Sequence, residues 1–213
     1  VARALKEAGC IYVDMGVESG DEYVRNEILK RNMNDEEIIK AANCFHEVGL
    51  AFTTLNMIGF PGETPEQMIK TITLNQKIKP TAALITTFFP FPKTDLAERS
   101  VQEGYINESN YKLMIEGHVS YKEETILDHP YKKEIMWVWA FFPIVVKYPK
   151  LMPLLRKLPP TRTFRFISTF FSTPLRNYMI RVRETISMIS NSMKRSFALS
   201  IDKLFYSRVS SKQ

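Results

Sequence analysis

Two kinds of hydrophobic pattern alternate along the first half of the chain. Three apolar runs of strand length, Cys10–Val17, Ala51–Ile58 and Ala83–Phe89, are separated by longer segments in which apolar residues recur every three or four positions. The short runs predict strands, and the longer period predicts amphipathic helices. Strands that alternate with helices are typical of a parallel sheet, either open or closed into a barrel. We therefore predict an α/β fold for this part of the chain.

The two helices between the predicted strands have strong start signals. Asn34 is followed three residues later by Glu37, and Thr64 is followed by Pro65 and, at the same spacing, by Gln67. This is the capping-box pattern, in which the side chains of the first turn satisfy free backbone N–H groups. Proline is favoured at the first helical position. We therefore predict helices that begin at residues 35 and 65.

Beyond Gly104 the pattern weakens to loop and short helix, and then to helices punctuated by prolines. The apolar run Ile135–Val146 is too short to cross a bilayer and is broken by Pro143, so we expect a buried or interfacial helix there. We place a division near residue 106, between the α/β part and a mainly helical extension.

Charge changes sign along the chain. Residues 1–130 carry 13 Lys or Arg and 20 Asp or Glu, whereas residues 131–213 carry 16 and 3, so the two parts have net charges of −7 and +13. Such asymmetry indicates either an anionic partner for the second part or a solvated basic face on an ordinary helical extension.

Basic and aromatic residues are interleaved in this second part. Arg162, Arg165, Phe166, Thr169 and Phe170 lie within about two helical turns of one another. Farther on, apolar residues alternate with arginines at Leu175, Arg176, Met179, Arg181, Val182 and Arg183. Short amphipathic pieces of this kind lie on an anionic membrane surface more readily than they track a nucleic acid. We expect weak, salt-sensitive membrane contact and disfavour nucleic acid as a partner.

The cysteines and histidines do not form a recognisable site. Cys10 and Cys44 give neither a disulfide framework nor a metal motif, and they suit a reducing cytoplasm. His46, His118 and His129 share no metal-ligand spacing. We predict no metal ligands within the chain.

Chemistry is expected where the strands end, because parallel α/β folds bind ligands at the carboxyl ends of their strands. Alternation along the first strand places Ile11, Val13, Met15 and Val17 on one face and Tyr12, Asp14, Gly16 and Glu18 on the other. Carboxylates are costly in a packed core unless they are paired. The second face therefore lines a polar cavity, with Gly16 leaving room for a ligand, or Asp14 is a structural acid. For Glu18, at the strand end, ligand contact is favoured.

The other two strand ends carry rigid turns. In GFPGET, residues 59–64, the amides of a helix start could hold a phosphate. Pro61 removes one donor and no Walker-type lysine follows, so phosphate binding is weakly supported. In FFPFPKT, residues 88–94, two prolines keep the chain extended and leave carbonyls outside a sheet. Such carbonyls beside aromatic rings suit a flat heterocycle such as adenine, or the segment is an extended connector to a helix opened by Thr94.

Three segments together resemble a known family. They are MGVESGDEYVRNEILKRN, NMIGFPGETPEQMIKTI and FPFPKTDLAERSVQEGYI, at residues 15–32, 56–72 and 89–106. In this order and spacing they resemble the radical S-adenosylmethionine (SAM) superfamily, and most of all its cobalamin-associated branch with G-x-E-S, G-x-P-G-E-T and P-x-P-G-T signatures. The resemblance covers residues 1–106. It implies a partial (β/α) TIM-type barrel, its last three strands, followed by an α-helical C-terminal extension over residues 107–213.

The resemblance also implies site residues. Glu18 and Ser19 match the strand end that contacts the ribose or amino acid part of SAM, and Lys30 or Arg31 matches a basic position near the SAM carboxylate. The strand on the adenine side and the backbone contact with adenine are matched by Met57, Ile58, Gly59, Phe89 and Pro90.

Two departures from the family pattern matter. Lys93 stands where the family usually has glycine, so we expect the backbone to differ there. The C-x3-C-x2-C motif that binds a 4Fe-4S cluster is absent, and Cys10 and Cys44 cannot replace it. Because the sequence opens at Val1 inside a predicted helix, without a signal-peptide pattern, we expect a fragment whose cluster-binding part lies upstream.

The resemblance implies an enzyme that reduces SAM through a 4Fe-4S cluster and starts radical chemistry such as methylation or ring formation. It further implies a reductant such as flavodoxin or ferredoxin, a small-molecule or lipid-like substrate, cobalamin as an added cofactor, and no activity in this chain alone. Two alternatives from other classes stay open. One is a non-enzymatic α/β module for a nucleotide or phosphosugar, and the other is a cytoplasmic protein that binds the membrane periphery.

Overall fold

The computed structural model describes residues 1–118 and 126–172 of the chain. Three parallel strands form one sheet in the order β1-β2-β3. They are β1 (Tyr12–Glu18), β2 (Ala51–Ile58) and β3 (Ala82–Thr87). The predicted α/β class is confirmed. The second strand has its predicted bounds, whereas β1 starts two residues later than predicted and β3 ends two residues earlier.

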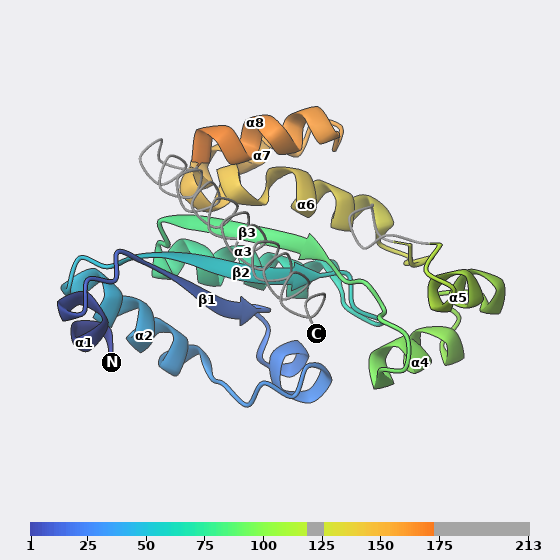
Figure 1. The fold of residues 1–213 in the computed structure, drawn as a ribbon. Coiled ribbons are helices and arrows are strands. Elements are labelled where there is room, and N and C mark those ends of the chain that lie inside the picture. The colour runs from blue at the N-terminus through green and yellow to red at the C-terminus, as the bar shows by residue number, and fades with distance from the viewer. Residues whose placement is uncertain (119–125, 173–213) are drawn as a thin grey trace, which may run out of the picture. The chain divides into compact units, whose positions relative to one another are not determined.

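Helices connect and follow these strands (Figure 1). In chain order they are α1 (Ala2–Glu7), the π-helical turn η1 (Val24–Ile28), α2 (Asp35–Glu47), α3 (Pro65–Ile78), α4 (Asp95–Gln102), α5 (Glu108–Ile115), α6 (Lys132–Lys147), the 3-10 turn η2 (Pro149–Leu151), α7 (Met152–Leu155) and α8 (Arg162–Ser172). Both predicted capping boxes are present, since Asn34 exchanges hydrogen bonds with Glu37 and Thr64 with Gln67. Thr94 caps α4 as predicted.

One face of the sheet is covered by α2, α3 and α6, and the core lies beneath them (Figure 1). Alternate strand residues point into this layer, among them Val17, Phe52, Ile58 and Ile85, all of which are buried. The opposite face carries Asp14, Gly16, Leu55, Met57 and Thr86, on the alternate positions. Among the described residues, helices on this one face give the layout of a (β/α) barrel segment, in which the helices lie outside the sheet.

The run Ile135–Val146 forms most of α6 and is buried against β3 and α3, as the sequence predicts. The helix is not broken at Pro143, however, because it continues through this proline. A proline inside a helix has no N–H for the carbonyl four residues earlier, here that of Trp139. Helix α8 repairs the gap, since Arg165 Nη1 donates to the Trp139 carbonyl at 2.6 Å.

This contact corrects the prediction for Arg165. The sequence pattern places its charge on an amphipathic surface, but the guanidinium lies inside, 5.3 Å from the Trp139 ring, and also donates to the Ile85 carbonyl at 2.9 Å. The predicted amphipathic piece from Leu175 to Arg183 lies outside the described residues. Within the described part of the chain, each helix is too short or too polar to span a bilayer.

Candidate functional site

Strand β1 ends in an irregularity that presents an ion pair. The register with β2 shifts between Gly16 and Glu18, and Glu18 has a left-handed backbone with φ 63. Bulges of this kind re-aim side chains and are common beside active sites. Glu18 Oε1 accepts a hydrogen bond from Arg31 Nη2 at 2.9 Å, with the two side chains 23% and 44% exposed.

Gly16 makes space for this pair. A Cβ atom on Gly16 would lie 2.9 Å from Nη2 of Arg31 and 3.1 Å from Oε1 of Glu18. The room that we expected a ligand to use is therefore taken by the two charged groups. A ligand would meet them rather than the bare glycine backbone.

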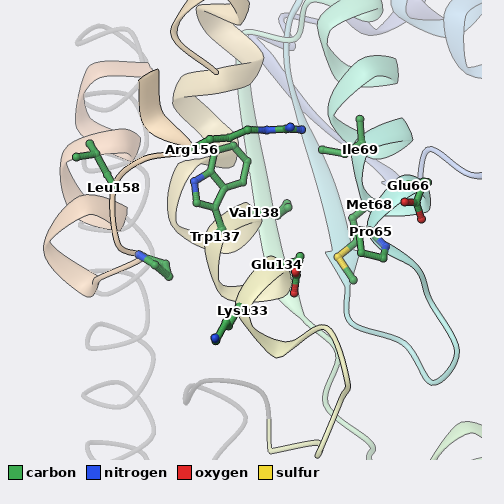
Figure 2. A pocket seen from close by; sticks show the side chains of 11 residues that line it. Pro65, Glu66, Met68, Ile69, Lys133, Glu134, Trp137, Val138, Arg156 and Leu158 are labelled. Carbon is green, nitrogen blue, oxygen red and sulfur yellow. The ribbon is translucent and has the colours of Figure 1, made fainter. Parts of the chain in front are cut away.

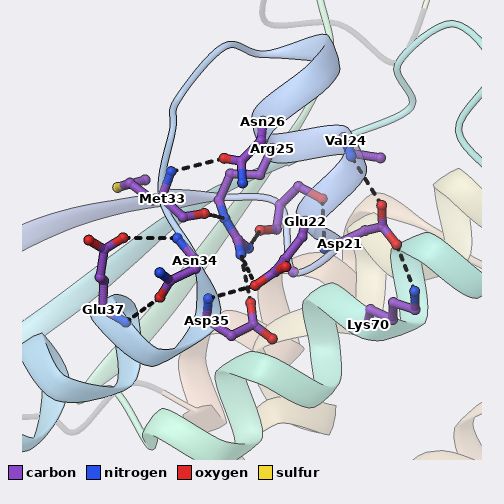
Figure 3. A network of polar contacts seen from close by, with 12 residues as sticks. Asp21, Glu22, Val24, Arg25, Asn26, Met33, Asn34, Asp35, Glu37 and Lys70 are labelled. Carbon is purple, nitrogen blue, oxygen red and sulfur yellow. Dashed lines mark hydrogen bonds and ion pairs between the residues drawn. The ribbon is translucent and has the colours of Figure 1, made fainter.

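A buried arginine fixes the segment that carries the ion pair (Figure 3). Arg25 is fully buried and donates to the carbonyls of Ser19 at 2.6 Å and Met33 at 2.8 Å, and to Asp35 at 2.6 Å. It thus joins the end of β1 to the start of α2. Ser19 is buried in the same turn, where its hydroxyl accepts from the Asp21 N–H at 3.2 Å.

The next two residues anchor the same turn to α3. Gly20 donates to Thr71 Oγ1 at 2.9 Å, and a Cβ at Gly20 would lie 2.3 Å from the Lys70 carbonyl oxygen, so only glycine fits. Asp21 accepts from Lys70 Nζ at 2.8 Å (Figure 3). Burial raises the pKa of Asp21, but the bonds from Lys70 and from the Val24 N–H outweigh it and hold the pKa below its usual value.

The turn after β2 is closed on itself by Glu63. This side chain is buried, and its Oε2 accepts hydrogen bonds from the N–H groups of Gly59 and Phe60. Burial raises the pKa of Glu63 to about 8. Its Oε1 has no hydrogen-bond partner among the described residues.

Two residues from farther along the chain hold the same turn. The Gly62 N–H donates to the Tyr105 hydroxyl at 2.9 Å, and His129 Nε2 lies 3.1 Å from the Phe60 carbonyl oxygen. With Glu63 on the other amides, the turn has its N–H groups engaged by the protein itself. This arrangement disfavours the phosphate-binding alternative for GFPGET, because a phosphate needs such groups free.

A cavity of about 730 Å³ opens beside the carboxyl ends of β2 and β3. Its lining is mainly aromatic and aliphatic, with a lysine, an aspartate and threonines as the polar members: Ile28, Leu29, Lys30, Met57, Phe60, Thr86, Thr87, Phe88, Phe89, Phe91, Thr94, Asp95 and Leu96. The rings of Phe60 and Phe88 are 5.2 Å apart, and those of Phe89 and Phe91 are 5.0 Å apart. A cavity of this size and lining suits a flat, largely apolar group with a few polar edges.

The turn after β3 follows the expectation in part. Phe88 still donates to the Ile58 carbonyl at 2.7 Å, and the Phe89 carbonyl accepts from the Phe91 N–H at 2.9 Å. The Phe89 carbonyl is thus outside the sheet, as predicted, but it has a local partner. Lys93 has φ 67, so the backbone takes the left-handed form natural to glycine. Lysine at this position is therefore compatible with a turn that glycine would also form.

The structure distributes the predicted site residues over three environments. Glu18 and Arg31 form the ion pair, and Met57 and Phe89 line the cavity. The others are packed inside or form turns: Ser19, Ile58, Gly59 and Pro90. Sequence reasoning missed the buried Arg25 and the place of Phe60 in the cavity. The aromatic rings of FFPF had been predicted beside a flat heterocycle, and they line the cavity.

A second cavity, of about 680 Å³, lies in the helical layer, between the start of α3, α6 and the segment after α7 (Figure 2). The Trp137 ring stands in it with Met68, Ile69 and Arg156 around it. Its indole N–H donates to the Leu155 carbonyl at 3.0 Å. Because it lies among the helices rather than at the strand ends, we assign it no part in the candidate site.

The residues at the strand ends fit part of what the family resemblance implies. A carboxylate and a guanidinium, Glu18 and Arg31, complement the amino acid part of SAM, and the aromatic cavity fits adenine. A 4Fe-4S cluster does not fit, since the described residues hold no group of three or more His, Cys, Asp or Glu arranged for a metal. Cys10 and Cys44 lie apart as free thiols.

Comparisons with known proteins agree with this assignment. Residues 1–74 match the family model described as the Radical SAM superfamily. An uncharacterized methyltransferase from Pyrococcus horikoshii is 30% identical over 112 residues, which are 53% of this chain and 24% of the relative. The chain therefore spans about a quarter of this curated relative.

Among solved structures, the chain is similar to coproporphyrinogen III oxidase (HemN) from Escherichia coli, described as a radical SAM enzyme. The TM-score is 0.50, with 20% identity over 70% of this chain and 30% of that one. At this identity the likeness shows the fold alone, and that fold is the radical SAM TIM-type barrel. The family match over residues 1–74 and this likeness in fold agree with each other.

Proposed function

We propose that residues 1–106 form the SAM-binding half of a radical SAM barrel. The single observation that carries the proposal is the Glu18–Arg31 pair at the carboxyl end of β1. Both groups are partly exposed, so they can exchange their mutual bond for bonds to a ligand. An amino acid offers the complementary charges, since its carboxylate pairs with a guanidinium and its ammonium with a carboxylate. SAM carries such an amino acid part.

The cavity beside β2 and β3 provides the proposed place for adenine. Met57 and Phe89 supply apolar and aromatic surface, and Lys30 and Asp95 supply polar groups at the same cavity. Ser19, Ile58, Gly59 and Pro90 stay in the proposal as residues that shape the backbone at these strand ends.

In the whole protein, a 4Fe-4S cluster held outside this chain would supply the electron that cleaves SAM. The residues described here would orient SAM and exclude water around it. We propose methyl transfer to a small-molecule or lipid-like substrate as the reaction, with cobalamin as an added cofactor and flavodoxin or ferredoxin as the reductant. The printed name of the Pyrococcus horikoshii relative favours methyl transfer over ring formation.

Calorimetric titration of SAM into the 213-residue chain tests the proposed site. Glu18→Ala should weaken binding by about 1–3 kcal/mol, because a charge-assisted hydrogen bond to the ligand is lost. Glu36→Ala removes the same charge from the exposed start of α2 and should leave the affinity unchanged. Equal SAM affinity in both variants and the unmodified chain would return Glu18 to a structural role.

The same titration with ATP separates the proposal from a nucleotide-binding module. Binding of ATP with no binding of SAM would favour the module. An upstream reading frame that encodes a C-x3-C-x2-C motif would support the enzyme independently of either titration.

A further inference from the structure

Helix α8 turns an apolar stripe away from the body of the molecule. Phe166 and Phe170 are 72% and 59% exposed, their rings stack at 6.4 Å, and the neighbouring Ile167 is 38% exposed. Arg162 is also exposed and stands one turn before Phe166 on the same side of the helix. The stripe, Arg162, Phe166, Ile167 and Phe170, is therefore a mixed cationic and aromatic surface.

The opposite side of α8 is bonded to α6 through polar residues. Arg165 donates to the Trp139 carbonyl, and Ser168 Oγ accepts from the Ile144 N–H at 3.1 Å. Both partners lie beside Pro143, which interrupts the hydrogen-bond ladder of α6. Phe164 also faces α6, with its ring 5.4 Å from that of Phe141, so the inward side of α8 is filled while Phe166 and Phe170 stay outside. Contacts within the described part of the chain therefore do not explain why the stripe carries exposed aromatic side chains.

The segment that carries the stripe is strongly basic. Residues 131–172 contain eight Lys or Arg and a single acidic residue, Glu134, which gives a net charge of +7. The segment before α8 exposes further apolar side chains, with Leu151 36% and Leu154 62% exposed. A partner of this surface must accept both aliphatic groups and positive charge.

We infer that the stripe on α8 docks on an anionic lipid surface. Aromatic side chains enter the boundary between headgroups and acyl chains, while arginine and lysine attract anionic headgroups. A nucleic acid would stack on phenylalanine but offers no place for the aliphatic side chains of Ile167, Leu151 and Leu154. A second copy of the chain would bring another basic segment against the first, which like-charge repulsion opposes.

The test is co-sedimentation of the 213-residue chain with vesicles of phosphatidylglycerol or of phosphatidylcholine. Phe166→Ser with Phe170→Ser should lower binding to phosphatidylglycerol vesicles at least tenfold, with an unchanged melting temperature because both rings are exposed. A matched control, Leu113→Ser with Ile115→Ser, removes two exposed apolar side chains from α5, which is flanked by Glu108 and Glu116, and should change binding less than twofold. Raising NaCl from about 0.1 M to about 0.5 M should weaken binding steeply.

Insertion of the stripe gives a second readout. The Phe166→Trp variant should gain a blue-shifted emission component with phosphatidylglycerol vesicles, relative to the unmodified chain with its two native tryptophans. The proposal is overturned if the α8 double variant binds vesicles as well as the unmodified chain does. It is equally overturned by binding of transfer RNA without vesicle binding, or by a dimer that the double variant dissociates while vesicle binding persists.

Discussion

Lys93 shows at the residue scale how a backbone shape can persist after its usual residue is lost. Its φ of 67 is the conformation that glycine adopts without strain, whereas other residues pay roughly 1–2 kcal/mol for it. The strain is tolerated because the Lys93 N–H donates to the Tyr111 hydroxyl at 3.3 Å and Thr94 caps α4 directly afterwards.

Lys93→Gly should therefore raise the free energy of unfolding, by about 0.5–1 kcal/mol after the entropy cost of glycine in the unfolded chain is deducted. Urea denaturation of this chain measures the change. Lys40→Gly, in the exposed interior of α2, should do the opposite and cost about 1 kcal/mol. A loss of stability at Lys93 comparable with that at Lys40 would contradict the strain argument.

The buried carboxyl group of Glu63 should make the stability of the protein depend on pH. Its pKa rises from 4.5 to about 8 in the folded chain, so the folded state holds a proton that the unfolded state releases between these values. The contribution of Glu63 to stability is thus fully present below pH 4.5 and is lost as the pH rises towards 8. Glu63→Gln keeps an acceptor for the Gly59 and Phe60 amides but cannot ionise.

The stability of Glu63→Gln relative to the unmodified chain should therefore increase by about 3–4 kcal/mol between pH 5 and pH 8. Burial lowers the pKa of His129, which costs stability below pH 6.5, but this titration is common to both proteins and cancels. Glu36→Gln, at an exposed position, is the control. A difference that does not vary with pH would show that Glu63 is ionised in the folded chain.

At the scale of elements, α6 and α8 form one hydrogen-bonded unit around Pro143. Arg165→Met removes the donor to two buried carbonyls, those of Trp139 and Ile85, and should cost about 3 kcal/mol. Pro143→Ala restores an N–H for the Trp139 carbonyl within α6. In the Pro143→Ala background the cost of Arg165→Met should therefore fall by about 1 kcal/mol.

Thermal unfolding of the two single variants and the double variant measures this coupling. Strictly additive effects would mean that Arg165 acts through Ile85 and the Trp139 ring alone. Arg162→Met is the control for this comparison, because Arg162 is exposed and its loss should have little influence on stability.

At the scale of the whole molecule, the sequence predicted what local signals determine. The capping residues Asn34 and Thr64 and the apolar run Ala51–Ile58 are specified within a few residues, and the structure has them as predicted. The interior position of Arg165 and the close packing at Gly20 were missed because their partners lie far away in the sequence. Nothing near Arg165 shows that Pro143 frees a carbonyl for it, and nothing near Gly20 shows that α3 passes within contact of its backbone.

The candidate site likewise has a part that the sequence predicts and a part that it does not. Glu18 and Arg31 were predicted as site residues from the resemblance, and the structure pairs them with each other. The aromatic cavity depends on three strand ends meeting, which the chain pattern indicates only once the sheet order is known. Periodicity fixes which residues share a face, but it does not fix which turns lie side by side.

The self-closed turn at Glu63 has a consequence for how this protein can change over evolutionary time. Since the turn uses its own carboxylate to hold the amides of Gly59 and Phe60, its shape does not depend on any bound molecule. Selectivity at this edge then rests on exchangeable side chains such as Met57, Phe89 and Lys30. Single substitutions can therefore reshape the lining of this cavity over generations while the turn that frames it keeps its fold.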